Sequence, residues 1–431
     1  MCIIKCNINK DWSHGYHVPV IIAMKIFPSS EYHQIIKYTG YWLCASIAIG
    51  LISGLASTLI FSCFDIANKV RALYPALIYF LPFVGLFIGY LFYRFGTPIE
   101  KGTHLLIDEI HEPKSFIPKR MSPLIFFSAI LTQLFGGSAG REAPAVQLSG
   151  ALTDHIAQVL RVSRDHRKIF LMASIGSGFA GIFGLPLAGA MYGLEITALG
   201  NLRYSAVFPC FISSLIAAKI PEAFDIVHPH VFYVVSSYPD INLKILLSLI
   251  VAGLIFGVAA RLFIASIHYA SVGFKKVIPF MPFRAMVGGI VLMLLTLWVG
   301  SQEFNGLGVN KVIAAFYVPL PVTDFLNKTL FTALTLGSGF KGGEITPLFF
   351  VGATLGNALG GFLPLPLSLL AAMGLVGIFS GASKAPITSL ILAVELFGTS
   401  SIVYATIICL LAYLFSGNCG LYRTQKPTAD D

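Results

Sequence analysis

Two charged residues lie where the surrounding sequence predicts lipid. Arg141 and Glu142 follow the charge-free segment from Ser122 to Gly140, which has the length of a membrane crossing. Both belong to the glycine-rich stretch Gly136–Pro144. A glycine-rich turn that opens a helix leaves several backbone N–H groups free and directs them to one point, and this geometry binds anions. A carboxylate held beside the same N–H groups competes with the anion for them.

Glu142 has two interpretations. A glutamate in the first turn of a helix is favoured by the macrodipole, so Glu142 could be a structural residue at an aqueous surface. However, an intramembrane carboxylate in apolar sequence is a functional candidate by default. We therefore predict that charged Glu142 blocks an anion path, and that protonated Glu142 moves aside and carries a proton. Arg141 is expected to neutralise a vestibule or to pair structurally rather than to touch the ion.

A second glycine-rich helix start occurs later in the chain, at Gly337–Pro347. Glu344 and Thr346 fall in the first turn of the helix that it opens. One alternative is that Glu344 only caps this helix. Two facing helix starts that each carry a carboxylate instead favour a shared site for an anion and protons.

An internal repeat relates the two helix starts. Residues 186–195, with the sequence PLAGAMYGLE, recur as PITSLILAVE at 386–395. Two related halves with Gly- and Pro-broken segments at corresponding positions are typical of an inverted-repeat transporter, whose site lies where the halves meet. Glu195 and Glu395 end the two copies, and we expect them to be structural carboxylates, paired across helices or with a basic loop.

The composition indicates a membrane protein. Of the 431 residues, 56% are hydrophobic and 11% are charged, and the mean hydropathy is +0.80, whereas soluble domains carry about 25% charged residues. Charge-free runs longer than one crossing, interrupted by Gly and Pro, predict an all-α polytopic protein with broken, tilted helices. The net charge of +9 is spread over short loops, which is typical of cytoplasmic faces and not of a nucleic-acid-binding surface.

The chain is expected to form one transmembrane domain. Residues 1–35 read as an N-terminal cytoplasmic segment and 36–431 as a single domain, with halves at about 38–218 and 241–422 and no C-terminal nucleotide-sensing domains. The seven cysteines show no metal-ligand spacing, so no metal site or cofactor is expected. No catalytic constellation is found, which makes a membrane enzyme a remote alternative.

The motif Gly140-Arg-Glu-Ala-Pro144 resembles the GREGP element of the CLC family of chloride channels and proton-coupled anion antiporters. The PLAG sequence at 186–189 and the second helix start follow in the order found in that family. The resemblance covers about Tyr38 to Tyr422 and is greatest to the fluoride-exporting branch. Four segments carry this finer likeness: LIDEIHEP at 106–113, GGSAG at 136–140, GGEITP at 342–347 and SGNCGLY at 416–422.

The resemblance implies roles for individual residues. Glu142 would be the gating, proton-accepting glutamate, and Tyr422 a hydroxyl donor that lines the anion path. Glu344 and Thr346 match the acidic helix start of the fluoride branch, where chloride members have an apolar and a small residue. Gating and proton transfer are thus assigned to Glu142 and Glu344. The implied anion-binding set is Thr103, Gly140, Arg141, Ala143, Ile345, Thr346 and Tyr422.

The sequence departs from the family pattern in three places. Thr103 replaces the usual serine of chloride members and the methionine of many fluoride members. Ala143 replaces the glycine after the gating glutamate. Ile196 stands where chloride/proton antiporters carry an inner proton glutamate, and Glu195 precedes it by one position, which rotates a helical side chain by about 100°. The fluoride branch also lacks that inner acid.

These observations predict a secondary active transporter that exports fluoride in exchange for protons. We expect a homodimer with multiple spans in the bacterial inner (plasma) membrane, whose partners are fluoride or chloride, protons and the lipid bilayer. The alternatives are a chloride/proton antiporter and a passive anion channel of the same fold.

Overall fold

The structure describes most of the chain, starting with the long helix α1. The computed structural model describes residues 29–197, 202–418 and 420–422. Helix α1 starts at Ser29, inside the expected cytoplasmic segment, and the remainder of that segment, residues 1–28, lies outside the described residues. The chain divides into the units 1–44 and 45–431, and the contacts discussed below all lie within the second unit.

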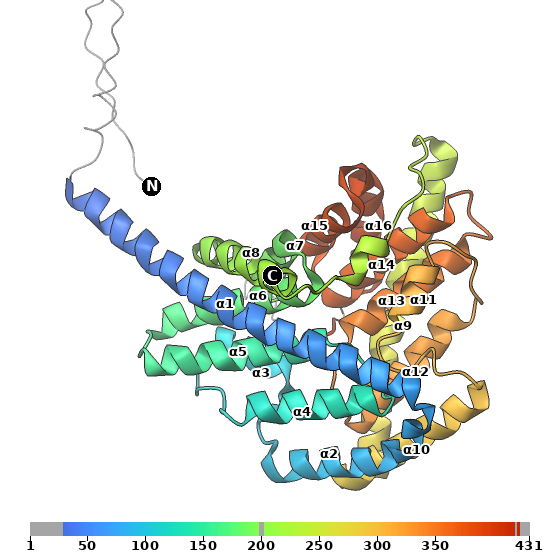
Figure 1. The fold of residues 1–431 in the computed structure, drawn as a ribbon. Coiled ribbons are helices and arrows are strands. Elements are labelled where there is room, and N and C mark those ends of the chain that lie inside the picture. Colours follow the sequence, from blue (N-terminus) through green and yellow to red (C-terminus); the bar gives the residue numbers. More distant parts are fainter. Residues whose placement is uncertain (1–28, 198–201, 419, 423–431) are drawn as a thin grey trace, which may run out of the picture. The chain divides into compact units, whose positions relative to one another are not determined.

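The described residues fold into helices of very different lengths (Figure 1). The first half contains α1 (Ser29–Leu73), α2 (Leu81–Phe95), α3 (Thr103–His111), α4 (Met121–Leu134), α5 (Glu142–Val159), α6 (Arg164–Phe183), α7 (Pro186–Glu195) and α8 (Val207–Ala223). The second half contains α9 (Leu243–Val277), α10 (Met281–Val299), α11 (Val309–Ala314), α12 (Asp324–Ser338), α13 (Ile345–Leu359), α14 (Leu367–Ser383), α15 (Pro386–Phe397) and α16 (Ile402–Phe415). No strand is present among these residues.

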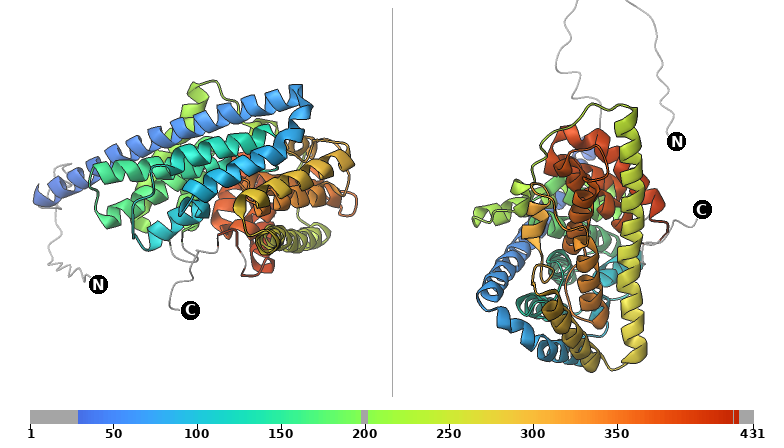
Figure 2. Two further views of the ribbon diagram at one scale, coloured as in Figure 1. Left: turned by 90° about the horizontal axis from the view of Figure 1, so that it is seen from below. Right: turned by 90° about the vertical axis from the view of Figure 1, so that its right-hand side faces the viewer.

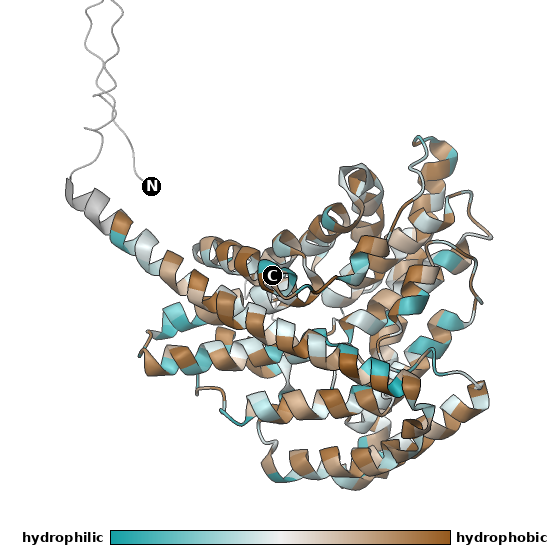
Figure 3. Ribbon diagram, viewed as in Figure 1, coloured by the Kyte–Doolittle hydropathy of each residue, from teal (hydrophilic) through white to brown (hydrophobic). Residues whose placement is uncertain are grey.

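Within the described residues, five helical segments are long and apolar enough to cross a membrane, and they include α1, α2, α8, α9 and α10. Figure 3 shows apolar residues along most of α2 and α10, and these two helices pack side by side. Large apolar side chains on them, such as Phe83 and Trp298, are exposed. Other apolar helices, including α4 and α13 to α16, are shorter than one crossing. The expected broken helices are therefore present.

The two halves repeat the same helix contacts. In the first half, α6 contacts α5, α7 and α8, and α7 also contacts α8. In the second half, α14 contacts α13, α15 and α16, and α15 also contacts α16. Helix α9 lies along α16 (Figure 2). The repeat-equivalent pairs α5 with α13 and α7 with α15 also contact each other, so the halves meet at corresponding helices. The structure thus contains the repeat that the sequence predicted.

Proline and left-handed residues mark the helix breaks that the repeat shares. Pro186 and Pro386 occupy the first positions of α7 and α15, where a missing N–H group costs nothing. Gly184 ends α6 in the left-handed region, and its repeat counterpart Lys384 ends α14 in the same conformation. The Lys384 ammonium donates to Ser416 Oγ at 2.6 Å and to the Gly417 carbonyl, beside the end of α16.

Two glutamates join α7 and α15 reciprocally. Glu195 accepts hydrogen bonds from the N–H of Thr388 at 2.7 Å and of Ile387 at 3.0 Å, at the start of α15. Glu395 accepts from the N–H groups of Leu187 (2.8 Å) and Ala188 (2.7 Å), at the start of α7. Each carboxylate therefore satisfies the free donors of the opposite helix, which is a structural contact across the halves.

Candidate anion site

The two glycine-rich loops are joined by a pair of backbone hydrogen bonds. Gly140 N–H donates to the Gly343 carbonyl at 2.7 Å, and Gly343 N–H donates to the Gly140 carbonyl at 2.9 Å. A Cβ atom at either position would overlap the carboxylate of Glu142. A side chain at either position would therefore displace the Glu142 carboxylate from this place, and the two hydrogen bonds of the bridge fix the start of α5 against the start of α13.

The Glu142 carboxylate reaches across this bridge to the opposite half. The side chain is only 1% exposed. One oxygen accepts from the N–H of Ile345 at 2.6 Å, and the other accepts from Thr346 Oγ1 at 2.7 Å. A carboxylate thus occupies the N-terminus of α13, where the free N–H groups and the dipole favour negative charge. This is the contact expected of a glutamate that competes with an anion.

Glu344 does not serve as the cap of its own helix. It occupies the N-cap position of α13, and its side chain makes no capping hydrogen bond. The N–H group of the next residue, Ile345, is instead bound by Glu142. The alternative that Glu344 only caps α13 is therefore not what the structure shows. Glu344 is partly buried, and the carboxylate that binds the N-terminus of α13 belongs to Glu142.

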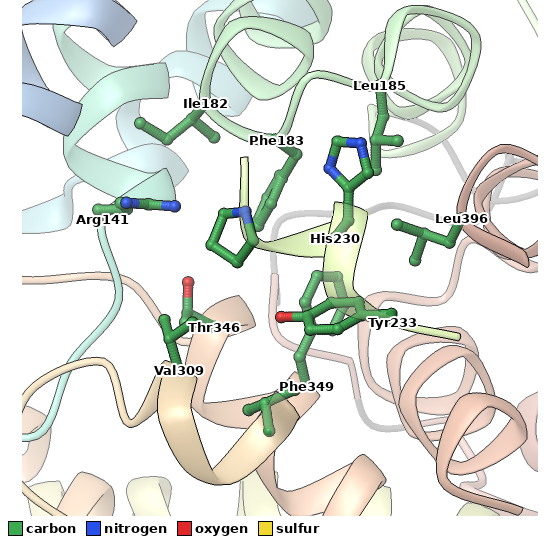
Figure 4. Close-up of a pocket in the computed structure, with 12 residues that line it drawn as sticks. Arg141, Ile182, Phe183, Leu185, His230, Tyr233, Val309, Thr346, Phe349 and Leu396 are labelled. Atoms are coloured by element: carbon green, nitrogen blue, oxygen red, sulfur yellow. The ribbon is translucent and has the colours of Figure 1, made fainter. Parts of the chain in front are cut away.

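Arg141 faces two cavities. Its guanidinium lies 3.7 Å from the centre of the Phe61 ring, and the side chain is 6% exposed. Within the described part of the chain, no carboxylate lies within ion-pair distance of it. It lines a cavity of about 660 Å³ together with Arg71 and Lys311. It also lines a smaller, mainly apolar cavity with Thr346 and Tyr233 (Figure 4). These positions favour the expectation that Arg141 neutralises a vestibule.

Thr103 and Tyr422 form a second group of site residues. Thr103 begins α3 directly after Gly102, which is left-handed, and its hydroxyl accepts from Gln147 Nε2 at 3.0 Å. The next residue, His104, packs its ring edge-on against Tyr422, with ring centres 5.6 Å apart. The Tyr422 hydroxyl lies 3.0 Å from the hydroxyl of Tyr192. The side chains of Thr103, Gln147, Tyr192 and Tyr422 are buried, and that of His104 is partly exposed.

Helix α5 connects the two groups. It carries Glu142 in its first turn and Gln147, which holds Thr103, in its second. Among the described residues no hydrogen bond joins Thr103 or Tyr422 directly to Glu142 or Thr346. Of the other expected residues, Gly140 is in the bridge, Ile345 supplies its N–H group, and Ala143 is buried at the start of α5.

Two polar residues at the site were not predicted from the sequence. Gln147 is an isolated amide in the apolar run that follows Glu142, and this isolation was a usable signal. Tyr192 lies within the repeated motif, at the position that Leu392 occupies in the second copy. The difference between the copies was visible, but its meaning depends on the contact with Tyr422.

Comparisons with known proteins show which family the chain resembles. Residues 84–417 match the family model described as voltage gated chloride channel. A chloride/fluoride channel protein of Pseudomonas syringae pv. tomato is 38% identical over 409 residues, which cover 94% of this chain and 90% of that protein. An H(+)/Cl(−) exchange transporter of Vibrio vulnificus is 28% identical over 334 residues, covering 71% and 70%.

Solved structures show the same fold. A crystal structure of a CLC-type fluoride/proton antiporter matches with a TM-score of 0.87 and 30% identity, over 90% of this chain and 98% of that one. A slow cyanobacterial Cl−/H+ antiporter matches with a TM-score of 0.74 over 87% and 94%, and at 20% identity it supports the fold alone. Since the family model spans most of the sequence, the chain belongs to the CLC family of voltage-gated chloride channels and related anion transporters.

Proposed function

We propose that the protein exports fluoride in exchange for protons. The observation that carries this proposal is the position of the Glu142 carboxylate on the N–H of Ile345 and the hydroxyl of Thr346. A group that must leave these donors before an anion can bind, and that can also take up a proton, links the two ions. The similarity to a fluoride/proton antiporter and to a chloride/fluoride channel protein supports the same function.

Coupling follows from competition for the same donors. Ionised Glu142 and an anion cannot both occupy the start of α13, because like charges repel and the donors are few. Protonation removes the charge and weakens the hold of these donors, so that the carboxyl group is released as the anion enters. Glu344 stands one residue before Ile345, so that, when ionised, it places a second negative charge at the same helix start and repels an ionised Glu142. Anion binding is therefore coupled to protonation of Glu142, and we propose that the two ions move in opposite directions.

Fluoride suits this site because the start of α13 offers hydrogen-bond donors. Stripping water from a small anion costs several kcal/mol unless the protein supplies replacement donors. The N–H of Ile345 and the hydroxyl of Thr346 are such donors. A protonated Glu344 would add an O–H donor, and short O–H hydrogen bonds favour the strongest acceptor. Fluoride accepts hydrogen bonds more strongly than chloride.

Flux from proteoliposomes tests the function directly. Wild-type protein should release fluoride faster than chloride, with a simultaneous proton movement in the opposite direction recorded by a pH electrode. In Glu142→Gln, proton movement should be abolished. The control is Glu112→Gln, a carboxylate whose side chain is 58% exposed and which lies outside the site. Equal chloride release by the wild type, or unchanged coupling in Glu142→Gln, would refute the proposal.

A chloride/proton antiporter is the second candidate. The hydroxyl of Thr103 uses its oxygen to accept from Gln147, so its own proton is still available for an anion. A hydroxyl at this position is the feature that the chloride members share, and it does not by itself select fluoride. Chloride flux coupled to protons, with fluoride flux no faster, would favour this candidate.

The cellular setting is part of the proposal. We place the protein in a bacterial inner membrane, where inward proton movement would drive fluoride out of the cell. We also propose a homodimer with one anion path in each subunit. Mass measurement of the protein in detergent or nanodiscs tests the dimer, and a monomeric mass with full transport activity would contradict it.

A further inference from the structure

Tyr192 makes a polar contact that the proposed function does not yet use. Its hydroxyl oxygen lies 3.0 Å from that of Tyr422, although the two residues are 230 positions apart in the sequence. The side chains are 1% and 5% exposed. Tyr192 belongs to α7, whereas Tyr422 follows α16 at the end of the described chain. The contact therefore joins the first half to the residue that is expected to line the anion path.

The ring of Tyr192 is held by aromatic side chains from both halves. Its centre lies 4.5 Å from that of Phe179, at an interplanar angle of 33°, and 6.2 Å from that of Phe379. Phe179 and Phe379 are repeat counterparts, on α6 and α14. Aromatic contacts of this kind fix the ring plane. Because the ring is fixed, the position of the hydroxyl oxygen is fixed as well.

The fold itself does not require a hydroxyl at this position. The repeat counterpart of Tyr192 is Leu392, which is fully buried in α15. An aliphatic side chain thus fills the equivalent place in the other half. A buried phenol needs a hydrogen-bond partner, and Tyr422 is the partner that the described residues provide. Packing at this position thus requires only an apolar side chain, and the hydroxyl of Tyr192 serves the contact with Tyr422.

The number of protons in the pair limits what each hydroxyl can do. A phenol has one proton to donate and two lone pairs to accept. If Tyr422 donates its proton to an anion, it cannot donate to Tyr192, and the contact survives only when Tyr192 donates to Tyr422. A hydroxyl that accepts one hydrogen bond becomes a stronger donor of the next. This gain is larger for a strong acceptor such as fluoride than for chloride.

We propose that Tyr192 is a positioning residue that directs the Tyr422 hydroxyl toward the anion and so increases the preference for fluoride over chloride. The inference rests on the proposed function, in which Tyr422 lines the anion path. It adds a residue that acts on the anion through another side chain. Without an anion, the same pair can reverse its hydrogen bond, with Tyr422 donating to Tyr192.

Anion binding to purified protein tests the inference. Tyr192→Phe keeps the ring and removes one hydroxyl. Fluoride affinity measured by calorimetry should fall roughly three- to tenfold, which is the effect of one hydrogen bond, and chloride affinity should change less. The control is Tyr404→Phe, which removes a buried hydroxyl that donates to the Pro239 carbonyl. It should leave both affinities unchanged. Equal losses for the two anions, or no loss, would overturn the inference.

A double-mutant cycle separates positioning from a general structural role. In Tyr422→Phe, the hydroxyl through which Tyr192 acts is gone, so adding Tyr192→Phe should change fluoride affinity little further. Additive losses would overturn the inference, as would a loss that simply follows a lowered unfolding temperature. If the wild type binds chloride as tightly as fluoride, the proposed fluoride function fails. The cycle repeated with chloride then still decides whether Tyr192 acts through Tyr422.

Discussion

The carboxylate of Glu142 is stabilised by donors that belong to the other half of the chain. These donors are the N–H of Ile345 and the hydroxyl of Thr346, and both lie more than 200 positions from Glu142 in the sequence. The residues that flank Glu142 in the sequence therefore give no sign of them. The close fit depends on the bare backbone of Gly343. A methyl group at this position would overlap the Glu142 carboxylate. The absence of a side chain at Gly343 is therefore as important for the site as the side chains that form it.

Gly343→Ala should therefore disable the site. The added methyl group would displace the carboxylate from α13, and we expect coupled exchange to fall more than tenfold. The matched control is Gly361→Ala, because a Cβ atom at Gly361 meets nothing within 4 Å. Exchange is measured in proteoliposomes, after gel filtration has shown that both variants remain folded. Normal coupling in Gly343→Ala would show that the contact is not needed.

His228 should make stability depend on pH. Burial lowers the pKa of His228 to about 4, and the positive charges of His230 and Arg141 act in the same direction, against the hydrogen bond to the Gly181 carbonyl. The unfolded chain gains a proton near pH 6.5 whereas the folded chain does not, so stability is lost as pH falls from about 6.5 to 4. In His228→Gln, the unfolding temperature should fall less over this range. An identical fall in both proteins would contradict the assignment.

At the scale of elements, α7 and α15 stabilise each other through their ends. Each helix begins with proline and offers its free N–H groups to a glutamate at the far end of the other. The two contacts are not equal. Glu195 also accepts from the hydroxyl of Thr388 at 2.7 Å, whereas the residue equivalent to Thr388 in α7 is Ala188.

Removing these glutamates should therefore have unequal costs. Glu195→Ala and Glu395→Ala each remove a charged cap, which costs about 1–2 kcal/mol. Glu195→Ala also leaves the buried Thr388 hydroxyl without that partner, so its unfolding temperature should be the lower of the two. The exposed Glu112→Ala serves as the control. Equal unfolding temperatures for all three variants would exclude the structural role.

At the scale of the whole molecule, the exposed apolar side chains need a lipid environment. Trp298 near the end of α10 is 83% exposed, on a helix that is long and apolar enough to span a membrane. Tryptophan at such a position is typical of the membrane interface. In bilayers with brominated lipid, part of the protein fluorescence should be quenched, and Trp298→Phe should reduce that part. An unchanged quenched fraction would place Trp298 away from lipid.

The sequence predicted those features that depend on local pattern. Glycines before helix starts, prolines at first helical positions and the repeated PLAG-type segment indicated the helix breaks and the two related halves, because each reflects backbone geometry nearby. The sequence predicted that the two helix starts face each other, but it did not predict the backbone hydrogen bonds between Gly140 and Gly343. The contact of Tyr192 with Tyr422 had no local signal, since it depends on how helices from different halves pack. Whether Glu344 caps its helix also depended on which residue occupied the free N–H groups.

The Gly140–Gly343 bridge has a consequence for how the transporter can move. Two hydrogen bonds join the halves at the candidate anion site, and the reciprocal glutamates join them again at α7 and α15. A cycle in which one half rocks as a rigid body against the other would have to break these contacts on every turnover. In contrast, a carboxylate that rotates about its side-chain bonds breaks only the hydrogen bonds that the carboxylate itself accepts. The architecture therefore favours a stationary backbone, in which access alternates by the swing of single side chains.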